Sequence, residues 1–254
     1  MFKRFFVLLL KKLKILSAVS IKLTKITGKS KEEIHPKHLV KFQAWYLKYL
    51  GENDTVLDVG CNNGQHTMKA AKIVKHITGI DIDSAELGKA KREAARKNLH
   101  NIKFLKISAE KKLNFKANSF DKLLFFDVVE HLENQDLALS EIHRVLKKGG
   151  LLLIAAPNRN TSWKKLQKSV GLPYFSDPDH KREYSENEIS RLLKKHNFKI
   201  LGINPVVFDT PLAPIFDLIG AFSISTYSKL SDWKRQRAYQ NPAESTGFEI
   251  VAIK

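Results

Sequence analysis

The stretch VLDVGCNNGQHT (residues 56–67) decides the fold class of this 254-residue chain. It runs from an uninterrupted apolar segment into a loop that contains Gly60 and Gly64, and then into a segment with helical periodicity. Glycine permits unusual dihedrals and close approach of the backbone to a ligand, so this pattern is typical of a nucleotide-binding turn. Twenty-one residues after Gly60, a second apolar segment ends at Asp81, whose carboxylate can accept hydrogen bonds from both hydroxyls of a ribose. The two segments together predict a site for an adenosine-like ligand.

Outward from this stretch, short apolar segments alternate with amphipathic helical ones, which predicts parallel strands joined by right-handed crossover helices. The expected strands are residues 55–60, 76–81, 102–108, 120–128, 151–157, 198–208 and 247–254. The expected helices are residues 39–50, 66–74, 84–98 (capped by Ser84, with Asp83 as the alternative cap), 135–146 (stopped by Gly149 and Gly150) and 185–196. The predicted fold class is therefore α/β, a doubly wound, mainly parallel seven-stranded sheet. Residues 205–246 are expected to form a small C-terminal cap insertion over the carboxyl ends of the strands, where open α/β sheets bind ligands.

Composition limits the cellular setting and the chemistry. Apolar residues make up 43% of the chain, which supports a sizeable core and rules out disorder as the dominant state. Cys61 is the single cysteine, which excludes an internal disulfide and any multi-cysteine metal site and favours a cytoplasmic location. The formal charge is +18, and residues 1–48 hold twelve of the basic and two of the acidic side chains. An acidic surface or polyanion is therefore an expected partner.

Residues 1–29 form a basic amphipathic extension ahead of the domain expected at residues 30–254. Its uncharged runs, 5–10 and 15–21, are much shorter than the about 20 residues that cross a membrane, and lysines interrupt the apolar region that a signal peptide requires. An interfacial helix fits, because apolar residues recur at helical spacing between lysines that can meet anionic headgroups. The expected stripe is Phe2, Phe5, Phe6, Leu9, Leu13 and Leu16. The alternatives are a flexible basic extension and a helix packed on its own domain.

The location that follows is cytoplasmic and peripheral at the inner membrane face. A nucleic-acid partner is not expected, because the extension interleaves Leu and Phe where a phosphate-tracking tail has Arg, Gly and Ser. The basic segment around Trp233 (residues 229–237) is either a second basic patch or a solvated helix face.

Charge distinguishes between the adenosine-like ligands. The loop lacks the G-x-G-x-x-G pattern of dinucleotide sites, and Asp58 at its start would repel phosphates. A cationic sulfonium that bears an amino group would be attracted to this carboxylate. D-V-G-C-N-N-G (58–64) with G-I-D (79–81) resembles the class I S-adenosylmethionine-dependent methyltransferases, and the resemblance covers residues 39–157, which we take as the cofactor core.

The resemblance implies a Rossmann-like fold, S-adenosylmethionine as cofactor and a set of binding residues. Three further segments match in order: ISAE (107–110), FDVVEH (126–131) and EIHRVLKKGG (141–150). Ser108 stands where the family usually has an acidic residue, and Asn62 replaces the middle glycine of the first motif. The residues that the resemblance assigns to the cofactor are Asp58, Gly60, Cys61, Asn62, Gly64, Asp81, Ile82, Ser108, Ala109 and Asp127.

The acceptor side is expected in residues 158–254 and at the end of the fourth strand. We select His131 and His180 as catalytic candidates, to orient the acceptor or take its proton. Asp127, Glu130 and His131 lie at spacings that put them on one face of a helical turn, and they resemble the acidic-x-x-Glu-His pattern of ubiquinone-pathway O-methyltransferases. Some of those enzymes use magnesium, but the pattern is common without metal, so no metal is expected here. The alternatives are a structural turn at Glu130 and a surface turn at His180.

The predicted function is methyl transfer from S-adenosylmethionine to a small or lipid-linked acceptor, by O-methylation at a membrane surface. Three rivals remain: a nicotinamide-dependent oxidoreductase, a membrane-recruited nucleotide-binding module without catalysis, and an RNA methyltransferase. Saturable NADH binding would favour the first, cofactor binding without turnover the second, and steeply salt-dependent RNA affinity the third.

Overall fold

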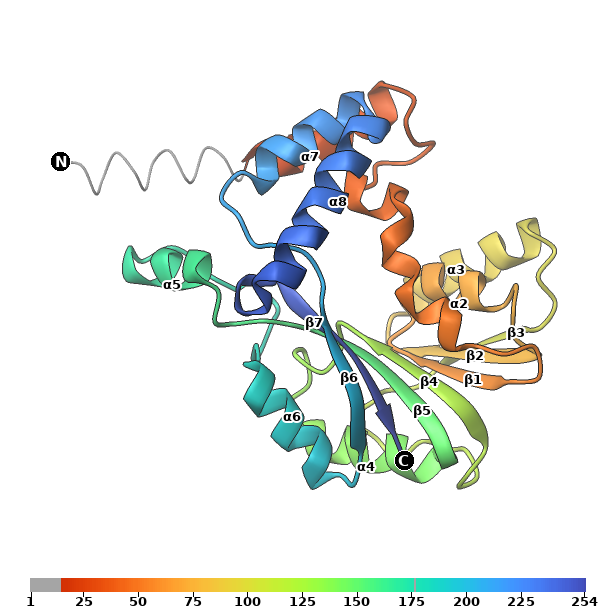
Figure 1. Ribbon diagram of the computed structural model, residues 1–254. Coiled ribbons are helices and arrows are strands. Elements are labelled where there is room, and N and C mark those ends of the chain that lie inside the picture. The colour runs from red at the N-terminus through yellow and green to blue at the C-terminus, as the bar shows by residue number, and fades with distance from the viewer. Residues whose placement is uncertain (1–14, 176) are drawn as a thin grey trace. The chain divides into compact units, whose positions relative to one another are not determined.

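The computed structural model describes residues 15–175 and 177–254 and divides into two compact units (Figure 1). The sheet unit comprises residues 44–157, 179–204 and 248–254. The helical unit comprises residues 1–43, 158–178 and 205–247, of which the structure describes the part from residue 15 onward except residue 176. Each unit is described by itself.

The sheet unit is built on a seven-stranded sheet in the order β3-β2-β1-β4-β5-β7-β6. Its strands are β1 (Thr55–Val59), β2 (His76–Asp81), β3 (Ile102–Lys106), β4 (Phe120–Phe126), β5 (Leu146–Pro157), β6 (Lys199–Pro205) and β7 (Gly247–Ile253). The β1–β2, β2–β3, β1–β4 and β4–β5 pairs are all parallel. The strand order reverses between β1 and β4, and open α/β sheets bind their ligands at such a reversal. The predicted fold class is confirmed.

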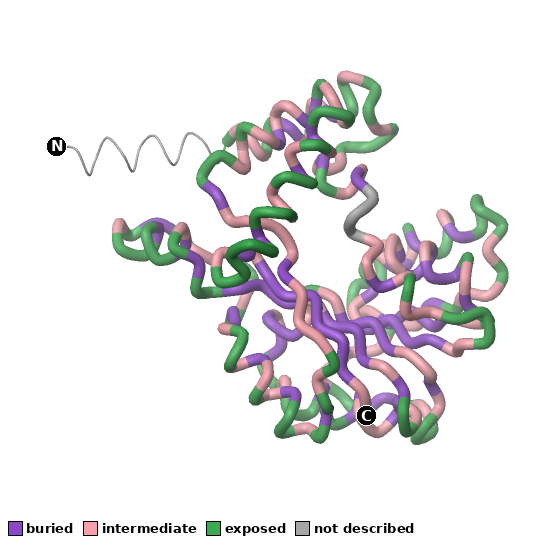
Figure 2. Tube along the Cα trace, viewed as in Figure 1, coloured by how far each residue is buried: buried purple, intermediate pink, exposed green. Residues whose placement is uncertain are grey.

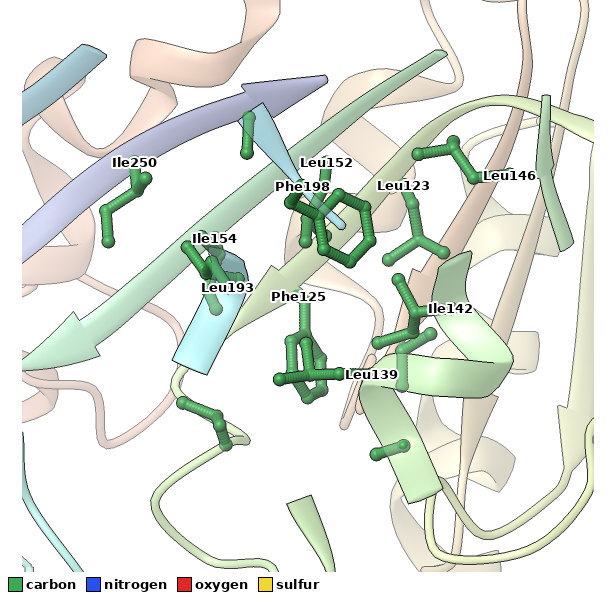
Figure 3. Close-up of a cluster of buried hydrophobic side chains, with 14 of the residues drawn as sticks. Leu123, Phe125, Leu139, Ile142, Leu146, Leu152, Ile154, Leu193, Phe198 and Ile250 are labelled. Carbon is green, nitrogen blue, oxygen red and sulfur yellow. The ribbon is translucent and has the colours of Figure 1, made fainter. Parts of the chain in front are cut away.

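The central strands are buried on both faces, as parallel strands covered by helices must be (Figure 2). Successive side chains of a strand point to opposite faces, so Leu123 and Phe125 of β4 join one cluster while Leu124 joins another. The first cluster, drawn in Figure 3, is completed by side chains of α4 (Gln135–Val145) and α6 (Glu186–Lys195). The second is completed by Tyr46 and the segment around α2 (Gln65–Ala70). Helices therefore cover both faces.

Three local predictions were wrong. Residues 39–50 form 3₁₀ turns, η1 (Pro36–Leu39) and η2 (Lys41–Tyr49), instead of an α-helix, because Tyr46 is fully buried and its ring packs on Phe126. Tertiary packing of this kind overrides helix propensity. The first choice of cap for α3 (Ser84–Arg96), Ser84, was also wrong, and the alternative, Asp83, caps the helix. The Asp83 carboxylate accepts hydrogen bonds from the Glu86 and Ala85 amides, which lower its pKa.

The third error concerns the start of β5. Gly149 and Gly150 lie inside this strand and do not precede it. The β4–β5 register shifts between Phe120 and Lys122, and a Cβ atom on Gly150 would lie 2.9 Å from the Asp121 carbonyl oxygen. The glycines therefore permit an irregular pairing that the sequence pattern presents as a turn.

The helical unit brings together three distant segments of the chain. Its elements are a helix at residues 15–26, η1, α5 (Ser162–Ser169), α7 (Ala213–Phe222), α8 (Ile224–Gln240) and η3 (Pro242–Glu244). A buried carboxylate on α7 joins the first and the last of these segments: Asp217 accepts a hydrogen bond from Ser17 at 2.6 Å and from Tyr227 at 3.2 Å, and pairs with His35 at 3.1 Å. Burial alone would raise the pKa of Asp217, but the contacts with His35 and Ser17 lower it on balance. Within the described residues, no helix combines the length and apolar character needed to cross a bilayer.

Candidate functional site

The loop after β1 is a tight, left-handed turn. Gly60 and Gly64 both have φ of 75°, and Asn62 has φ of 47°. A side chain at Gly60 would place its Cβ 2.3 Å from Cγ2 of Val128, so only glycine fits there. Asn62 adopts the left-handed region that asparagine tolerates better than most residues, which explains how the loop accommodates the departure from glycine at this position. The loop turns sharply at the carboxyl end of β1, next to the point where the strand order reverses.

The carboxylate of Asp81 is held rigidly at the end of β2. Its Oδ2 accepts a hydrogen bond from the Asn62 backbone amide at 2.7 Å, and its Oδ1 accepts one from the Asp83 amide at 2.9 Å. A carboxylate has about four acceptor positions, so further donors can still bind. The side chain is only half-buried. An oriented acceptor pair beside a turn is the chemistry that a ribose diol requires, so these residues fit the sugar of S-adenosylmethionine.

Asp58 is buried more deeply than Asp81. It is 3% exposed, and its Oδ2 accepts a hydrogen bond from the Thr67 hydroxyl at 2.5 Å. Burial raises the pKa of Asp58 to about 7, the Thr67 hydrogen bond opposes this shift, and the charge of Asp81 adds to it. A cation placed near Asp58 would favour the ionised carboxylate, which fits a ligand with a sulfonium and an amino group.

The raised pKa of Asp58 predicts a pH-dependent stability. The folded state holds this proton more tightly than the unfolded chain, so the contribution is fully present below the ordinary carboxyl pKa and is lost as pH rises towards 7. We expect the free energy of unfolding of the cofactor-free protein to fall by roughly 2 to 3 kcal/mol more than that of the Asp58→Asn variant between about pH 5 and pH 8. Urea unfolding followed by circular dichroism measures both, and parallel pH profiles for the two proteins would contradict the assignment.

Of the other residues that the sequence analysis assigned to the cofactor, Cys61 is buried, whereas Ile82, Ser108 and Ala109 are exposed or half-buried. Cys61 is 7% exposed and packs in a core cluster with Met68 and Phe104, and burial raises the pKa of its thiol. The Cys61 side chain therefore contributes to packing, and only its backbone takes part in the surface of the loop. Ile82 is 66% exposed and directly follows the carboxyl end of β2. After β3, Ser108 and Ala109 are half-buried, and the Ser108 hydroxyl accepts a hydrogen bond from the Glu110 amide.

A strained turn follows β4. Asp127 has φ of 53°, and its amide donates to the Ala155 carbonyl of β5 at 3.0 Å. A non-glycine residue in this region costs about 1 to 3 kcal/mol and often marks a functional site. The turn places the Glu130 side chain inside the protein at 1% exposure and leaves His131 half-buried. A single turn follows at residues 129–131, where the His131 amide donates to the Val128 carbonyl at 2.9 Å, and the next helix, α4, begins at Gln135.

The structure brings His131 and His180 together although 49 residues separate them. Their rings meet edge to face with centroids 4.7 Å apart. The Glu130 carbonyl accepts hydrogen bonds from the Lys181 and Arg182 amides at 2.8 and 3.1 Å, which ties the segment after His180 to the turn after β4. The two catalytic candidates therefore belong to one cluster, and the surface-turn alternative for His180 is wrong, since its side chain is only 6% exposed.

Glu183, which the sequence analysis did not select, completes the cluster. Its carboxylate lies 3.0 Å from Nδ1 of His180, and Glu183 is 1% exposed. Such a contact fixes the ring orientation and turns Nε2 toward the Glu130 carboxylate, whose Oε1 lies 3.9 Å away. The H-x-x-E spacing (180–183) could have indicated this pair. Glu130, His131 and His180 also offer ligand atoms that all lie within 4.8 Å of one another, so these three side chains could hold a divalent cation.

Comparisons with known proteins identify the family of this chain. Residues 50–198 match the family model described as a methyltransferase domain, so the chain belongs to that family. A probable S-adenosylmethionine-dependent methyltransferase of Mycolicibacterium smegmatis is 28% identical over 65% of this chain and 58% of its own length. A ubiquinone biosynthesis O-methyltransferase of Bartonella tribocorum is 27% identical over 59% of this chain and 62% of its own length. The chain thus matches about three-fifths of the length of these relatives.

The fold has a solved counterpart. A structure of an S-adenosylmethionine-dependent methyltransferase from Methanosarcina mazei superimposes with a TM-score of 0.57 at 22% identity, covering 82% of this chain and 95% of the other. At this identity, the likeness shows the fold alone. The expected family, fold and cofactor, S-adenosylmethionine, are therefore confirmed.

Proposed function

We propose that this chain transfers a methyl group from S-adenosylmethionine to a hydroxyl oxygen of a small or lipid-linked acceptor. The cluster of His131, His180 and Glu183 beside the turn after β4 is the observation that carries this proposal. Family membership supports the donor, and this cluster supports the acceptor chemistry. The relative named as a ubiquinone biosynthesis O-methyltransferase supports a hydroxyl acceptor of this kind.

The cofactor would be held at the carboxyl ends of four strands, β1 to β4, which carry the sequence motifs. We assign the ribose hydroxyls to Asp81, the positively charged end of the cofactor to Asp58, and the adenine to Ile82, Ser108 and Ala109. The loop at Gly60, Cys61, Asn62 and Gly64 would approach the cofactor with its backbone, and Asp127 would border it from the turn after β4. When bound, S-adenosylmethionine supplies an electrophilic methyl group on a sulfonium. Because that group is already activated, the protein contributes mainly by positioning the acceptor.

On the acceptor side, His180 would accept the hydroxyl proton at Nε2. Its Nδ1 faces Glu183 at 3.0 Å, and a carboxylate there stabilises the imidazolium that forms when Nε2 takes up a proton. The His131 ring packs against the His180 ring and would orient the acceptor. No metal is required by this mechanism.

We also propose that the protein works in the cytoplasm at the inner membrane face, through the basic extension at residues 1–29. A lipid-linked acceptor and an amphipathic basic segment are consistent with each other. Of the expected apolar stripe, Phe2, Phe5, Phe6, Leu9 and Leu13 lie outside the described residues. Leu16 lies within them and is half-buried.

The test is transfer of isotope-labelled methyl groups from S-adenosylmethionine to a lipid extract, an aqueous metabolite extract and total RNA. We expect label in the lipid or metabolite fraction, as an ether stable to mild alkali, and none in RNA. Cofactor binding without transfer to any fraction would favour the non-catalytic module, and label in RNA would favour an RNA methyltransferase. Loss of transfer in EDTA, with recovery on adding Mg²⁺, would assign Glu130, His131 and His180 to a metal instead of to proton transfer.

A further inference from the structure

The helix at residues 15–26 turns its polar face inward and its apolar face outward. Ser20 and Thr24 are completely buried, whereas Ile15, Val19 and Ile26 are 60%, 39% and 77% exposed. These three apolar residues are spaced by four and seven positions, so they share one face of the helix. A helix of a globular domain ordinarily shows the opposite arrangement.

Hydrogen bonds fix this orientation. On the inner face, the Ser17 hydroxyl donates to the buried Asp217 carboxylate at 2.6 Å, and the Thr24 hydroxyl donates to the Ile34 carbonyl at 2.8 Å. At the end of the helix, the Thr27 hydroxyl donates to the Ala221 carbonyl of α7 at 2.5 Å. Rotating the helix to bury its apolar face would break all three bonds. The outward position of Ile15, Val19 and Ile26 is therefore built into the helical unit.

The apolar surface continues onto α7. Phe222 is 59% exposed and directly follows Ala221, whose carbonyl is bonded to Thr27, the neighbour of Ile26. We name Ile15, Val19, Ile26 and Phe222 the outer face. Single exposed apolar residues are ordinary. Four exposed apolar side chains that extend from one helix to the next, opposite a buried polar face, indicate a surface that a partner or a membrane covers.

The charges around the outer face indicate which kind of surface covers it. Lys22, Lys25 and Lys29 are all exposed on the same segment, and no acidic residue occurs between Ile15 and Lys31. Across its full sequence, the helical unit carries 19 basic and 7 acidic side chains, an excess of 12 out of the +18 of the chain. Apolar side chains interleaved with lysines match the headgroup region of an anionic bilayer, where aliphatic groups enter the acyl boundary and lysines meet phosphates.

We propose that the outer face and its three lysines dock the helical unit on an anionic phospholipid bilayer. This inference rests on the membrane location in the proposed function. It assigns membrane contact to the outer face of the helical unit instead of to the apolar stripe expected in the N-terminal extension. It does not depend on methyl transfer. The lipid surface is thus recognised by the folded helical unit and not only by residues 1–14.

Vesicle flotation of the full chain tests this surface. We expect binding to vesicles of phosphatidylcholine mixed with phosphatidylglycerol and none to phosphatidylcholine alone. The Ile15→Ser/Val19→Ser/Ile26→Ser variant and the Lys22→Glu/Lys25→Glu variant should each bind about tenfold more weakly. Matched controls are Leu137→Ser/Leu166→Ser/Leu201→Ser, at 37%, 40% and 54% exposure, and Lys72→Glu/Lys91→Glu, which should bind like the wild type.

Three results would overturn the proposal. The first is a wild type that fails to bind anionic vesicles. The second is wild-type binding by both the triple Ser variant and the double Glu variant, together with loss of binding when residues 1–14 are deleted. A lipid-free dimer that the apolar variant converts to monomer in sedimentation velocity would identify the outer face as a contact between copies of the chain. Calorimetry with S-adenosylmethionine should give the same affinity for all variants. Vesicle binding without any methyl transfer would contradict the proposed function alone.

Discussion

The His180→Gln variant is expected to lose methyl-transfer rate by about 100-fold or more while it keeps its affinity for S-adenosylmethionine. His180 lies in the acceptor-side cluster, where its Nδ1 faces the buried Glu183 carboxylate at 3.0 Å and its ring packs on His131. Glutamine fills similar space but cannot accept a proton. Single-turnover transfer from labelled S-adenosylmethionine measures the loss, and calorimetry measures the retained affinity.

Two further variants test whether Glu183 acts through His180 and whether the effect is specific to this histidine. Glu183→Gln keeps a hydrogen-bonding side chain but removes the charge that favours the imidazolium, so the neutral imidazole that accepts the proton should persist to lower pH. The pH profile of the rate should therefore shift to lower pH, and the rate should fall less than in His180→Gln. A merely structural Glu183 would not move the profile. His100→Gln, at an exposed position of the sheet unit, should behave like the wild type. An unchanged rate in His180→Gln would exclude the proposed proton acceptor.

The Asp81→Ala variant is expected to bind S-adenosylmethionine at least about tenfold more weakly, a loss of about 1.4 kcal/mol. The substitution removes the ribose acceptor and also the hydrogen bond that holds the Asn62 amide at 2.7 Å. Calorimetric titration measures the change. Asp83→Ala is the matched control: it removes a carboxylate two residues away that caps α3, so it should lower the stability of the fold and leave cofactor affinity unchanged. Equal affinities of Asp81→Ala and the wild type would refute the ribose assignment.

The sheet and the cofactor side could be predicted from sequence because their signals are local. Apolar strands, the glycines at 60 and 64 and the carboxylate at 81 each depend on a few neighbouring residues, and parallel topology then brings the strand ends together. The β4 alternation of Leu123, Leu124 and Phe125 between two core clusters follows from the same short pattern. These features need no knowledge of distant contacts.

The features that were missed depend on contacts between distant segments. The meeting of His131 with His180 requires the backbone link from Glu130 to Lys181 and Arg182, which no local pattern indicates. The 3₁₀ turns at η2 result from burial of Tyr46. The inverted orientation of the helix at residues 15–26 depends on Asp217, which is 200 residues from Ser17. In each case a partner far along the chain overrides the local preference.

Calorimetric titration with S-adenosylmethionine, with S-adenosylhomocysteine and NADH in parallel, tests the central claim most directly. We expect saturable, about micromolar binding of the first two ligands and none of NADH, because the loop at Gly60 and the carboxylates of Asp58 and Asp81 suit a cationic adenosine ligand and not a pyrophosphate. Binding of NADH alone, or of none of the three, would contradict the assignment of the cofactor site.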